Sequence, residues 1–541
     1  MPPPLPDRRA ALAALAGERF DLLIAGGGCT GLGLAVEAAA AGLRTALVER
    51  EDFGSGTSSR STKLLHGGVR YLERAFTHAD ADEYRLVREA LAERAALFRL
   101  APHLAARLRI LTPCADQRSR LYYEAGLRLY DLLAGRAGLG ATRWLGPAEA
   151  SALFPGLPAA GRGGGVLYSD GQFDDARLCV LLAVTAAELG ATVANYVRVV
   201  GLVKENGAVV AAEAEDLLGG ARFAVRARTT VNAAGPFADG LAALDDPGRA
   251  PALAVSAGTH VVVGAGPCPP DTGLLVPRTI DGRVVFVLPW LGRTLIGTTD
   301  APAEPSAHPE VPPADVRYLL GQVNPYLAVP LRPEDVRSQW SGLRPLARGA
   351  AGSATAALSR RHAILQSPSG LVTVVGGKWT TYRRAAAAAL AHLDRTLRLG
   401  LPRAAGPREV PVAGAAAYSE AMVEALGRRH GLAPELAGHL GRRYGDRMAG
   451  VCALIAAGHG ARLVADFPYV EAEVLWGTRH EMARTVMDVL GRRTRLAFLD
   501  RAAAVACLPR VAQLMAAELG WDGPFRQRQE EEARARLAGA L

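Results

Sequence analysis

The stretch "FDLLIAGGGCTGLGLAVEAAAAGLRTALVER", residues 20–50, decides the fold of the N-terminal region. Its apolar run over 20–25 predicts a strand, the spacing over 30–41 predicts a helix, and 45–48 predict a second strand. Gly26, Gly28 and Gly31 form a G-x-G-x-x-G pattern between the first strand and the helix, and Glu49 ends the second strand. This order of strand, glycine turn, helix, strand and acid predicts a βαβ unit that binds a dinucleotide.

Each part of the pattern has a physical task. Gly26 permits the tight turn, Gly28 lets the backbone approach a pyrophosphate, and Gly31 lets the helix pack on the strand. The helix N-terminus then presents N–H groups and a dipole that favour phosphate. A carboxylate at Glu49 can accept hydrogen bonds from an adenosine ribose. The pattern alone does not separate NAD from FAD.

A loop rich in hydrogen-bond donors follows the acid, where an NAD-dependent domain would begin another helix. Residues 51–68 read "EDFGSGTSSRSTKLLHGG", with glycines that allow close backbone approach and hydroxyls that offer short donors. Such a loop can follow the pyrophosphate, ribityl chain and flavin ring of an extended cofactor. On composition alone, a solvated surface loop is the alternative. The hydroxyl donors are Thr57, Ser58, Ser59 and Ser61.

The composition bounds the class of protein. With 541 residues, half of them apolar and 21% charged, the chain is long enough for two or three globular domains. A net charge of +9 favours phosphate-bearing ligands or an anionic surface. Nucleic acid is not expected as a partner, because the arginines are scattered rather than clustered with aromatic residues.

The cysteines and the apolar segments indicate the compartment. Six cysteines without paired spacing favour reduced thiols in a cytosolic setting and no metal or disulfide framework. We expect no secretory signal at the N-terminus. No segment approaches the roughly 20 apolar residues that span a bilayer, so any membrane contact is expected to be peripheral.

Several further motifs extend the pattern over nearly the whole chain. They include "YSDGQFDDARL" (168–178), "VNAAGPFAD" (231–239), "GTHVVV" (258–263), "SGLRPL" (341–346) and "VVGGKWTTYR" (374–383). Together with "SGTSSRSTKLLHGGVRYLE" and the helical tail 466–500, the chain resembles the FAD-dependent glycerol-3-phosphate dehydrogenases. These are the quinone-linked enzymes of bacterial membranes and the mitochondrial inner membrane, and the tail is nearer the mitochondrial type.

The resemblance implies an α/β fold with a split Rossmann-like FAD-binding domain, like that of glutathione reductase or D-amino-acid oxidase. An antiparallel-sheet substrate domain is inserted in it and a helical domain follows. The expected segments are an extension (1–19), FAD-binding parts (about 20–75, 170–240 and 355–400), substrate-domain parts (76–169 and 241–354), a linker (401–417) and the helical domain (418–541).

The resemblance also implies the cofactor and its contacts. FAD is the expected cofactor, and no metal site is expected because no cluster has ligand spacing and no EF-hand loop is present. The expected FAD contacts are Gly26, Gly28, Thr30, Gly31, Glu49, Arg50, Thr57, Ser58, Ser61, Lys63, Leu65, His66, Gly67, Gly235, Gly377, Lys378 and Thr380.

The family reaction oxidises the C2 alcohol of glycerol 3-phosphate to dihydroxyacetone phosphate. His260 is the favoured base and His66 the alternative, since a pKa near 6.5 suits proton transfer at neutral pH. Lys378 is expected to stabilise the reduced flavin or the substrate phosphate. The expected substrate contacts are Arg70, Tyr71, His260, Arg344, Arg360 and Lys378, with Arg344 and Arg360 binding the phosphate in a bidentate fashion.

Three readings of the function stay open. The first is a dehydrogenase that passes electrons to membrane quinone from the cytoplasmic face of an inner membrane, as a peripheral protein on an anionic surface. The second is an oxidase that uses dioxygen, and the third is a non-catalytic nucleotide-binding regulator. The oligomeric state is also open, with a homodimer among the options.

Overall fold

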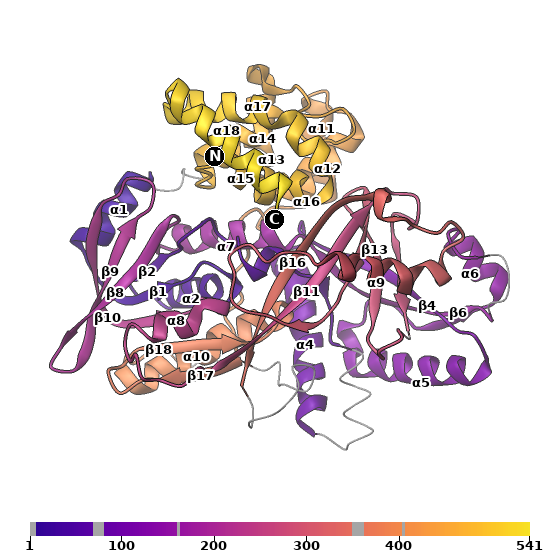
Figure 1. Cartoon of the computed structure of the whole chain (residues 1–541), viewed down its shortest axis with the longest axis horizontal. Helices are drawn as coiled ribbons and strands as arrows, with labels where there is room; N and C mark the ends of the chain where they lie inside the picture. The colour runs from indigo at the N-terminus through magenta and orange to yellow at the C-terminus, as the bar shows by residue number, and fades with distance from the viewer. Residues whose placement is uncertain (1–6, 69–80, 159–162, 278, 349–361, 403–405) are drawn as a thin grey trace.

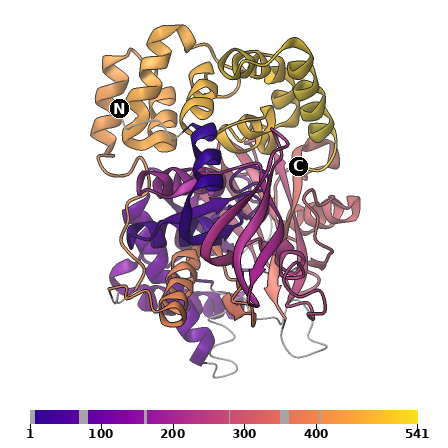
Figure 2. The ribbon, with the colours of Figure 1, turned by 90° about the vertical axis from the view of Figure 1, so that its left-hand side faces the viewer.

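Two β-sheets lie side by side, and a group of C-terminal helices lies across one end of both (Figures 1 and 2). The structure is a computed structural model that describes residues 7–68, 81–158, 163–277, 279–348, 362–402 and 406–541. It confirms the predicted class, an α/β cofactor-binding domain with a second, largely antiparallel sheet and a helical C-terminal domain.

The first sheet contains eight strands among the described residues. The order is β17–β18–β10–β1–β2–β7, with β9 paired to β10 and β8 to β9. From β18 to β7 the strands are parallel. The strands are β1 (Arg19–Ala25), β2 (Thr45–Val48), β7 (Thr192–Ala194), β8 (Val197–Glu205), β9 (Ala208–Asp216), β10 (Arg222–Asn232), β17 (His362–Gln366) and β18 (Val372–Gly376).

Helices cover one face of this sheet, and this explains the continuous apolar run of β1. Helices α2 (Cys29–Ala40), α7 (Asp175–Glu188) and α10 (Tyr382–Leu397) share a hydrophobic core with it. On the opposite face, Leu15 of helix α1 (Arg8–Gly17) packs against strand residues such as Phe20. A strand buried on both faces needs apolar residues on both.

The second sheet contains ten strands among the described residues. Its order is β15–β11–β14–β13–β12–β4–β6–β3, with β16 paired to β11 and β5 to β6. The strands are β3 (Leu64–Leu65), β4 (Ala105–Pro113), β5 (Arg143–Leu145), β6 (Gly165–Phe173), β11 (Leu253–Val263), β12 (Thr272–Val276), β13 (Val285–Trp290), β14 (Arg293–Gly297), β15 (Ala301–Pro302) and β16 (Val336–Ala347).

Short helices connect and flank the sheets. The α-helices are α4 (Ala81–Leu100), α5 (Gln117–Ala134), α6 (Pro147–Leu153), α8 (Ala238–Ala242) and α9 (Pro313–Val323). The 3-10 turns that matter for the site are η1 (Thr57–Ser59), η3 (Gly235–Phe237) and η7 (Trp379–Thr381). Asn206 and Gly207 form a hairpin turn between β8 and β9, and both have positive φ, 50° and 80°.

The C-terminal domain is helical, as predicted. Its residues share one hydrophobic core with the second sheet, in which Trp340 and Trp290 meet Phe498 and Leu499. Its helices are α11 (Glu420–Arg429), α12 (Pro434–Tyr444), α13 (Met448–Leu454), α14 (Glu471–His480), α15 (Val486–Asp488), α16 (Leu496–Leu499), α17 (Arg501–Leu519) and α18 (Gly523–Ala538), with a π-turn η10 (Val489–Arg493) before α16.

The prediction that no segment approaches membrane-spanning length and hydropathy was wrong. Among the described residues, one helix, α17, is long and apolar enough by length and composition, with 19 residues and a mean hydropathy of 1.3 over an 18-residue stretch. Pro509 and Arg510 interrupt its apolar pattern in the sequence, and this hid the helix. Much of its apolar side, including Leu508 and Met515, is buried in the protein core, which gives the hydropathy a packing explanation.

Candidate functional site

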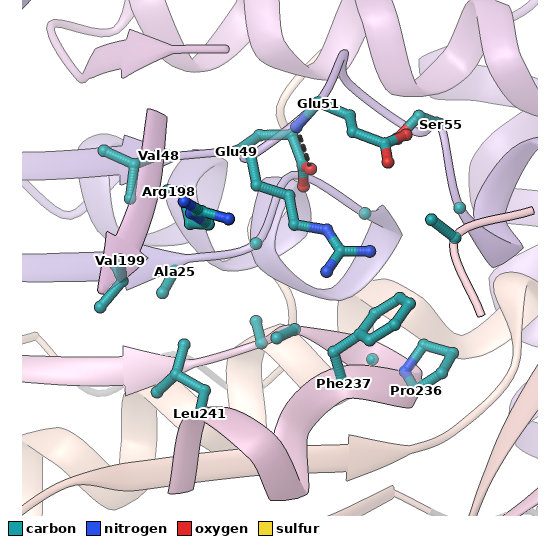
Figure 3. Close-up of a pocket in the computed structure, with 18 of the residues that line it drawn as sticks. Ala25, Val48, Glu49, Glu51, Ser55, Arg198, Val199, Pro236, Phe237 and Leu241 are labelled. Carbon is teal, nitrogen blue, oxygen red and sulfur yellow. Dashed lines mark hydrogen bonds between the residues drawn. The ribbon is translucent and has the colours of Figure 1, made fainter. Parts of the chain in front are cut away.

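A cavity of about 470 Å³ lies at the carboxyl ends of β1 and β2, between these strands, β8 and the turn that leads into α8 (Figure 3). Gly26, Gly28 and Glu49 of the predicted dinucleotide unit line it, together with Thr57 and Ser58 of the donor-rich loop. Ligands of open α/β folds bind at this end of the strands. The cavity therefore joins the two stretches that the sequence singled out.

The three glycines differ in what surrounds them. A Cβ on Gly31 would lie 1.9 Å from the carbonyl oxygen of Gly26, and a Cβ on Gly26, at φ +122°, would lie 2.5 Å from that of Ala233. These two positions are closed by protein backbone. Gly28 has φ −83°, and a Cβ there would meet only Ser58 Oγ at 3.2 Å. The space beside Gly28 is thus available to a ligand.

Glu49 is held in place by backbone donors. Gly27 N–H donates to Oε2 at 2.6 Å. Glu51 N–H donates to Oε1 at 2.9 Å, the contact drawn in Figure 3. Burial raises the pKa of the Glu49 carboxyl, and these two hydrogen bonds oppose the rise. Each carboxylate oxygen keeps a lone pair, so the group can still accept hydrogen bonds from ribose hydroxyls.

The donor-rich loop is attached to three distant parts of the chain. Cys29 N–H, at the start of α2, donates to Ser58 Oγ at 2.9 Å, and Trp379 Nε1 donates to Ser58 O at 2.8 Å. Thr57 Oγ1 donates to Leu343 O of β16 at 2.5 Å. These contacts fix Thr57 and Ser58 along the cavity wall, so the loop is not a solvated surface loop.

Ser61 and Lys63 of the same loop are bound to Asp175 instead. Ser61 Oγ lies 2.7 Å from Asp175 Oδ2, and the Lys63 ammonium lies 2.6 Å from the same oxygen. Burial lowers the pKa of Lys63 to about 7, although the Asp175 carboxylate opposes this change. Neither Ser61 nor Lys63 lines the cavity, so their predicted cofactor contacts stay predictions.

His260 is a buried residue of β11. Its Nε2 lies 2.9 Å from Thr62 Oγ1, and its ring is stacked on Trp340 with a centroid separation of 5.4 Å. Burial, followed by the charges of Lys63 and Arg344, lowers the pKa of His260 well below its ordinary value. The imidazole is therefore neutral at neutral pH, the state that a general base needs.

Arg344 of β16 already contacts several protein acceptors. Its guanidinium donates to Ala257 O at 3.2 Å and Thr299 O at 3.1 Å, and it pairs with Asp300 at 3.2 Å. A substrate phosphate would have to share these donors or displace an acceptor. The predicted phosphate contact of Arg344 therefore remains a prediction.

The structure places the other predicted residues as follows. Thr30 lies in α2, Leu65 is buried in β3, His66 is half-buried, and Gly67 N–H donates to Tyr130 Oη at 2.6 Å. Gly235 and Arg50 line the cavity, whereas Gly377, Lys378 and Thr380 lie at the junction of β18 with η7. Arg70, Tyr71 and Arg360 lie outside the described residues.

The second wall of the cavity was missed in the sequence. The Arg50 guanidinium carbon lies 3.7 Å from the ring centroid of Phe237. Val197 and Leu241 also line the cavity, and Figure 3 shows Phe237 and Leu241 on the turn and helix that form this wall. The motif "VNAAGPFAD" pointed to this turn but gave a role only to Gly235. The contribution of β8 left no signal, because its alternation is that of any sheet strand.

FAD fits the residues that are present. Gly28 leaves backbone space at the N-terminus of α2, Glu49 offers acceptors at one end, and the hydroxyls of Thr57 and Ser58 continue along the wall. An extended dinucleotide needs this order of groups. Among the described residues, no group of three or more His, Cys, Asp or Glu could hold a metal ion.

Comparisons with known proteins agree with this site. Residues 21–383 match the family described as FAD dependent oxidoreductase, and residues 407–524 match the C-terminal domain of alpha-glycerophosphate oxidase. Mitochondrial glycerol-3-phosphate dehydrogenase of Homo sapiens is 43% identical over 98% of this chain and 75% of its own length. The mitochondrial glycerol-3-phosphate dehydrogenase SDP6 of Arabidopsis thaliana is 40% identical over 96% of this chain and 86% of its own length.

A solved structure extends the likeness to the fold. The glycerol-3-phosphate dehydrogenase from Bacillus halodurans, complexed with FAD, has a TM-score of 0.80 and 27% identity, over 99% of this chain and 97% of that one. The chain belongs to the family of FAD-dependent glycerol-3-phosphate dehydrogenases of the mitochondrial type.

Proposed function

We propose that the protein oxidises the C2 hydroxyl of sn-glycerol 3-phosphate to the ketone of dihydroxyacetone phosphate. The substrate loses a hydride from C2 and a proton from the hydroxyl oxygen. Bound FAD supplies the two-electron acceptor for this oxidation. The observation that carries the proposal is the cavity on the Gly26–Glu49 unit, in a chain of this family.

The chain's own residues would bind the phosphate and take the proton. His260 is our candidate for the base, because burial beside two cations keeps its imidazole neutral and Thr62 fixes its orientation. Arg344 is our candidate for the phosphate, and its charge is close enough to lower the pKa of His260. Lys378 would serve either the phosphate or the reduced flavin.

We propose membrane quinone as the electron acceptor, with dioxygen as the alternative. The mitochondrial dehydrogenase of Homo sapiens is 43% identical to this chain, about twice the identity of the glycerophosphate oxidase from Mycoplasma pneumoniae, which is 20% identical and shows the fold alone. The test is turnover of glycerol 3-phosphate with a soluble quinone analogue and, separately, in air. Quinone-dependent turnover with little peroxide supports the proposal, and peroxide as the main product would overturn the choice of acceptor.

A quinone dissolved in lipid requires contact with a bilayer, and helix α5 offers a suitable face. Leu121, Tyr122 and Leu132 are 59%, 49% and 75% exposed, and helical spacing places the two leucines on one side, with exposed Arg128 between them. Arg118 and Arg136 are exposed near the two ends of the helix. A face that combines exposed apolar side chains with arginines matches an anionic bilayer surface, with side chains that enter the headgroup region.

Helix α5 lies on the side of the molecule opposite the C-terminal helices (Figure 1). We therefore propose a peripheral protein that contacts the membrane through α5, on the cytoplasmic face of an inner membrane. All six cysteines are free, which fits a reducing compartment. The curated relatives are named mitochondrial, and that name leaves the membrane face of this protein to experiment.

Vesicle sedimentation tests this contact. We expect the protein to sediment with anionic vesicles at low salt, and Leu121→Glu with Leu132→Glu to reduce the bound fraction severalfold. Val329→Glu is the matched control, because Val329 is 77% exposed elsewhere on the surface. If the double variant sediments like the wild type, α5 is not the contact, and if no form sediments, the membrane proposal fails.

A further inference from the structure

Three buried charged residues form an ion-pair cluster beside the donor-rich loop. The Lys63 ammonium lies 2.6 Å from Asp175 Oδ2, and Arg495 Nη2 lies 3.3 Å from Asp175 Oδ1. All three side chains are fully buried. They come from the loop after β2, the start of α7 and the C-terminal domain. We call them the Lys63–Asp175–Arg495 cluster.

The cluster also forms hydrogen bonds with the backbone of the loop. Lys63 Nζ donates to Ser59 O at 2.8 Å, and Arg495 Nη2 donates to the same oxygen at 2.7 Å. Asp175 accepts from Ser61 N–H and Oγ–H at 3.1 and 2.7 Å. The conformation of residues 59–63 is thus fixed by one cation of the C-terminal domain and one carboxylate of α7.

The backbone conformations of two members of the cluster are unfavourable without these contacts. Lys63 has φ 64° and Arg495 has φ 66°, the left-handed region that favours glycine. Neither residue is a glycine, and both side chains are long and cationic. A conformation of this kind persists where its surroundings determine it, and such positions are common at functional sites.

The loop that the cluster holds in place contacts His260 directly. Thr62 lies between Ser61 and Lys63, and its Oγ1 is 2.9 Å from His260 Nε2. On its other side the His260 ring is stacked on Trp340, which meets Phe498 of α16 edge-on at 5.0 Å. The C-terminal domain therefore reaches the candidate base by two routes, one polar through Arg495 and one aromatic through Phe498.

The same loop also contacts the cofactor cavity. Ser58 lines the cavity and accepts from the first N–H of α2. The carbonyl of the next residue, Ser59, accepts hydrogen bonds from both cations of the cluster. A shift of Ser59 would move the cavity wall on one side and Thr62 on the other. The cluster thus determines the positions of two parts of the site that are adjacent in the sequence.

We propose that Arg495 is a positioning residue of the active site, which holds residues 58–63 so that Ser58 faces the cofactor and Thr62 orients His260. The C-terminal domain is then a working part of the catalytic centre. The catalytic half of this inference rests on the proposed function. The structural half, an ordered loop that depends on Arg495, does not.

The chain offers a matched control in Arg177. It is fully buried at the same domain interface and forms a two-pronged ion pair with Glu481, at 2.6 and 2.7 Å. Among the residues that the structure describes, its side chain hydrogen-bonds to Glu481 and to the carbonyl of Arg443, and not to residues 58–63 of the loop. Arg177→Met therefore removes an equally buried interface charge without touching the loop.

The experiment compares FAD-loaded wild type, Arg495→Met, Arg495→Lys and Arg177→Met. Hydrogen exchange should rise at least tenfold at the amides of 59–63 in Arg495→Met, partly recover in Arg495→Lys, and stay unchanged there in Arg177→Met. Flavin reduction by glycerol 3-phosphate should be slowed about tenfold or more at saturation in Arg495→Met, with the substrate Kd little changed, because misplacement of a reacting group affects the rate.

Each outcome bears on the proposal. Unchanged exchange at 59–63 in Arg495→Met overturns it, and equal effects of Arg177→Met on exchange and rate reduce Arg495 to an ordinary stabilising contact. If wild-type flavin is not reduced by glycerol 3-phosphate, the proposed function fails, whereas the exchange data still decide whether Arg495 orders the loop. Should Arg495→Met not fold, Arg495→Lys is measured against Arg177→Lys with the same criteria.

Discussion

The two ends of the proposed active site are built in different ways. The end around Glu49 comes from one continuous βαβ stretch, in which Gly26, Gly28 and Gly31 stand a few residues apart. The end around His260 is assembled from the loop at 58–63, β11, β16 and the C-terminal domain. The first end depends on local backbone space, and the second depends on long-range contacts between buried charges and rings.

This difference predicts how each end fails. A side chain at the Glu49 end should block the cofactor and leave the fold intact. A lost charge at the His260 end should cost stability and rate together, because the same contacts hold the domains and orient the reacting groups. Variants can therefore test whether the two ends are as separate as the structure indicates.

The largest expected effect is at Gly28. Gly28→Val adds a branched side chain to a residue with ordinary φ and open space, so we expect a folded protein that purifies without flavin. The ratio of flavin absorbance to protein absorbance measures this. Gly17→Val, in the open space at the end of α1, is the control and should retain flavin. Normal flavin content in Gly28→Val would remove the glycine pattern from the account.

The next largest effect is expected at Asp175. Asp175→Asn leaves Lys63 and Arg495 buried with less charge compensation, and loss of one partner of a buried ion pair costs about 3–5 kcal/mol. Urea unfolding measures the loss. Glu215→Gln, which removes surface ion pairs with Arg198 and Arg222, should leave the midpoint almost unchanged. Similar unfolding midpoints for the two variants would contradict a stabilising role of the Lys63–Asp175–Arg495 cluster.

Arg344 tests the substrate side of the second end. Arg344→Lys keeps the charge but loses the guanidinium fork, and loss of one charge-assisted contact costs roughly 1.5–3 kcal/mol, ten- to more than a hundredfold in kcat/KM. Glycerol lacks the phosphate and should react poorly with wild type and variant alike. If both substrates suffer equally, Arg344 serves the structure through Asp300 and its backbone acceptors.

A smaller effect is expected from the hydrogen bond between Thr62 and His260. Thr62→Val removes the Oγ1 contact while keeping the shape, and a single hydrogen bond contributes about 0.5–1.5 kcal/mol. We expect a two- to tenfold lower rate of flavin reduction with an unchanged substrate Kd. An unchanged rate would mean that Thr62 does not orient the base.

The smallest effect concerns pH. A base works in its neutral form, so activity falls as pH drops through its pKa, and the lowered pKa of His260 puts this acidic limb of kcat/KM well below pH 6.5. The charged groups facing His260 are Lys63 and Arg344. Lys63→Met removes one positive charge and should move the limb to higher pH. A limb at or above pH 6.5 in the wild type would point to another base.

The sequence predicted the local end of the site and not the assembled end. The strand at 20–25, the helix at 30–41 and the strand at 45–48 match β1, α2 and β2 to within a residue, because turn and pairing chemistry lie within the stretch itself. The residues that form the buried cluster with Lys63 are Asp175 and Arg495, 112 and 432 positions along the chain (175 − 63 and 495 − 63), and no periodicity connects them.

The pairing register supplies what the sequence could not. His260 lies directly opposite Trp340 in the antiparallel pair of β11 and β16, and this register stacks the two rings. His260 is a base candidate in the sequence analysis, where nothing indicates that a neighbouring strand fixes its ring. Arg344 lies on the same strand, four residues on, and its contacts with Asp300 were likewise invisible before folding.

The most direct test of the central claim is an anaerobic titration of the purified flavoprotein with glycerol 3-phosphate. We predict stoichiometric bleaching of the flavin absorbance, formation of dihydroxyacetone phosphate in equal amount, and recovery of the colour when quinone is added. Flavin that stays oxidised through excess substrate, in protein that dithionite reduces normally, would contradict the account.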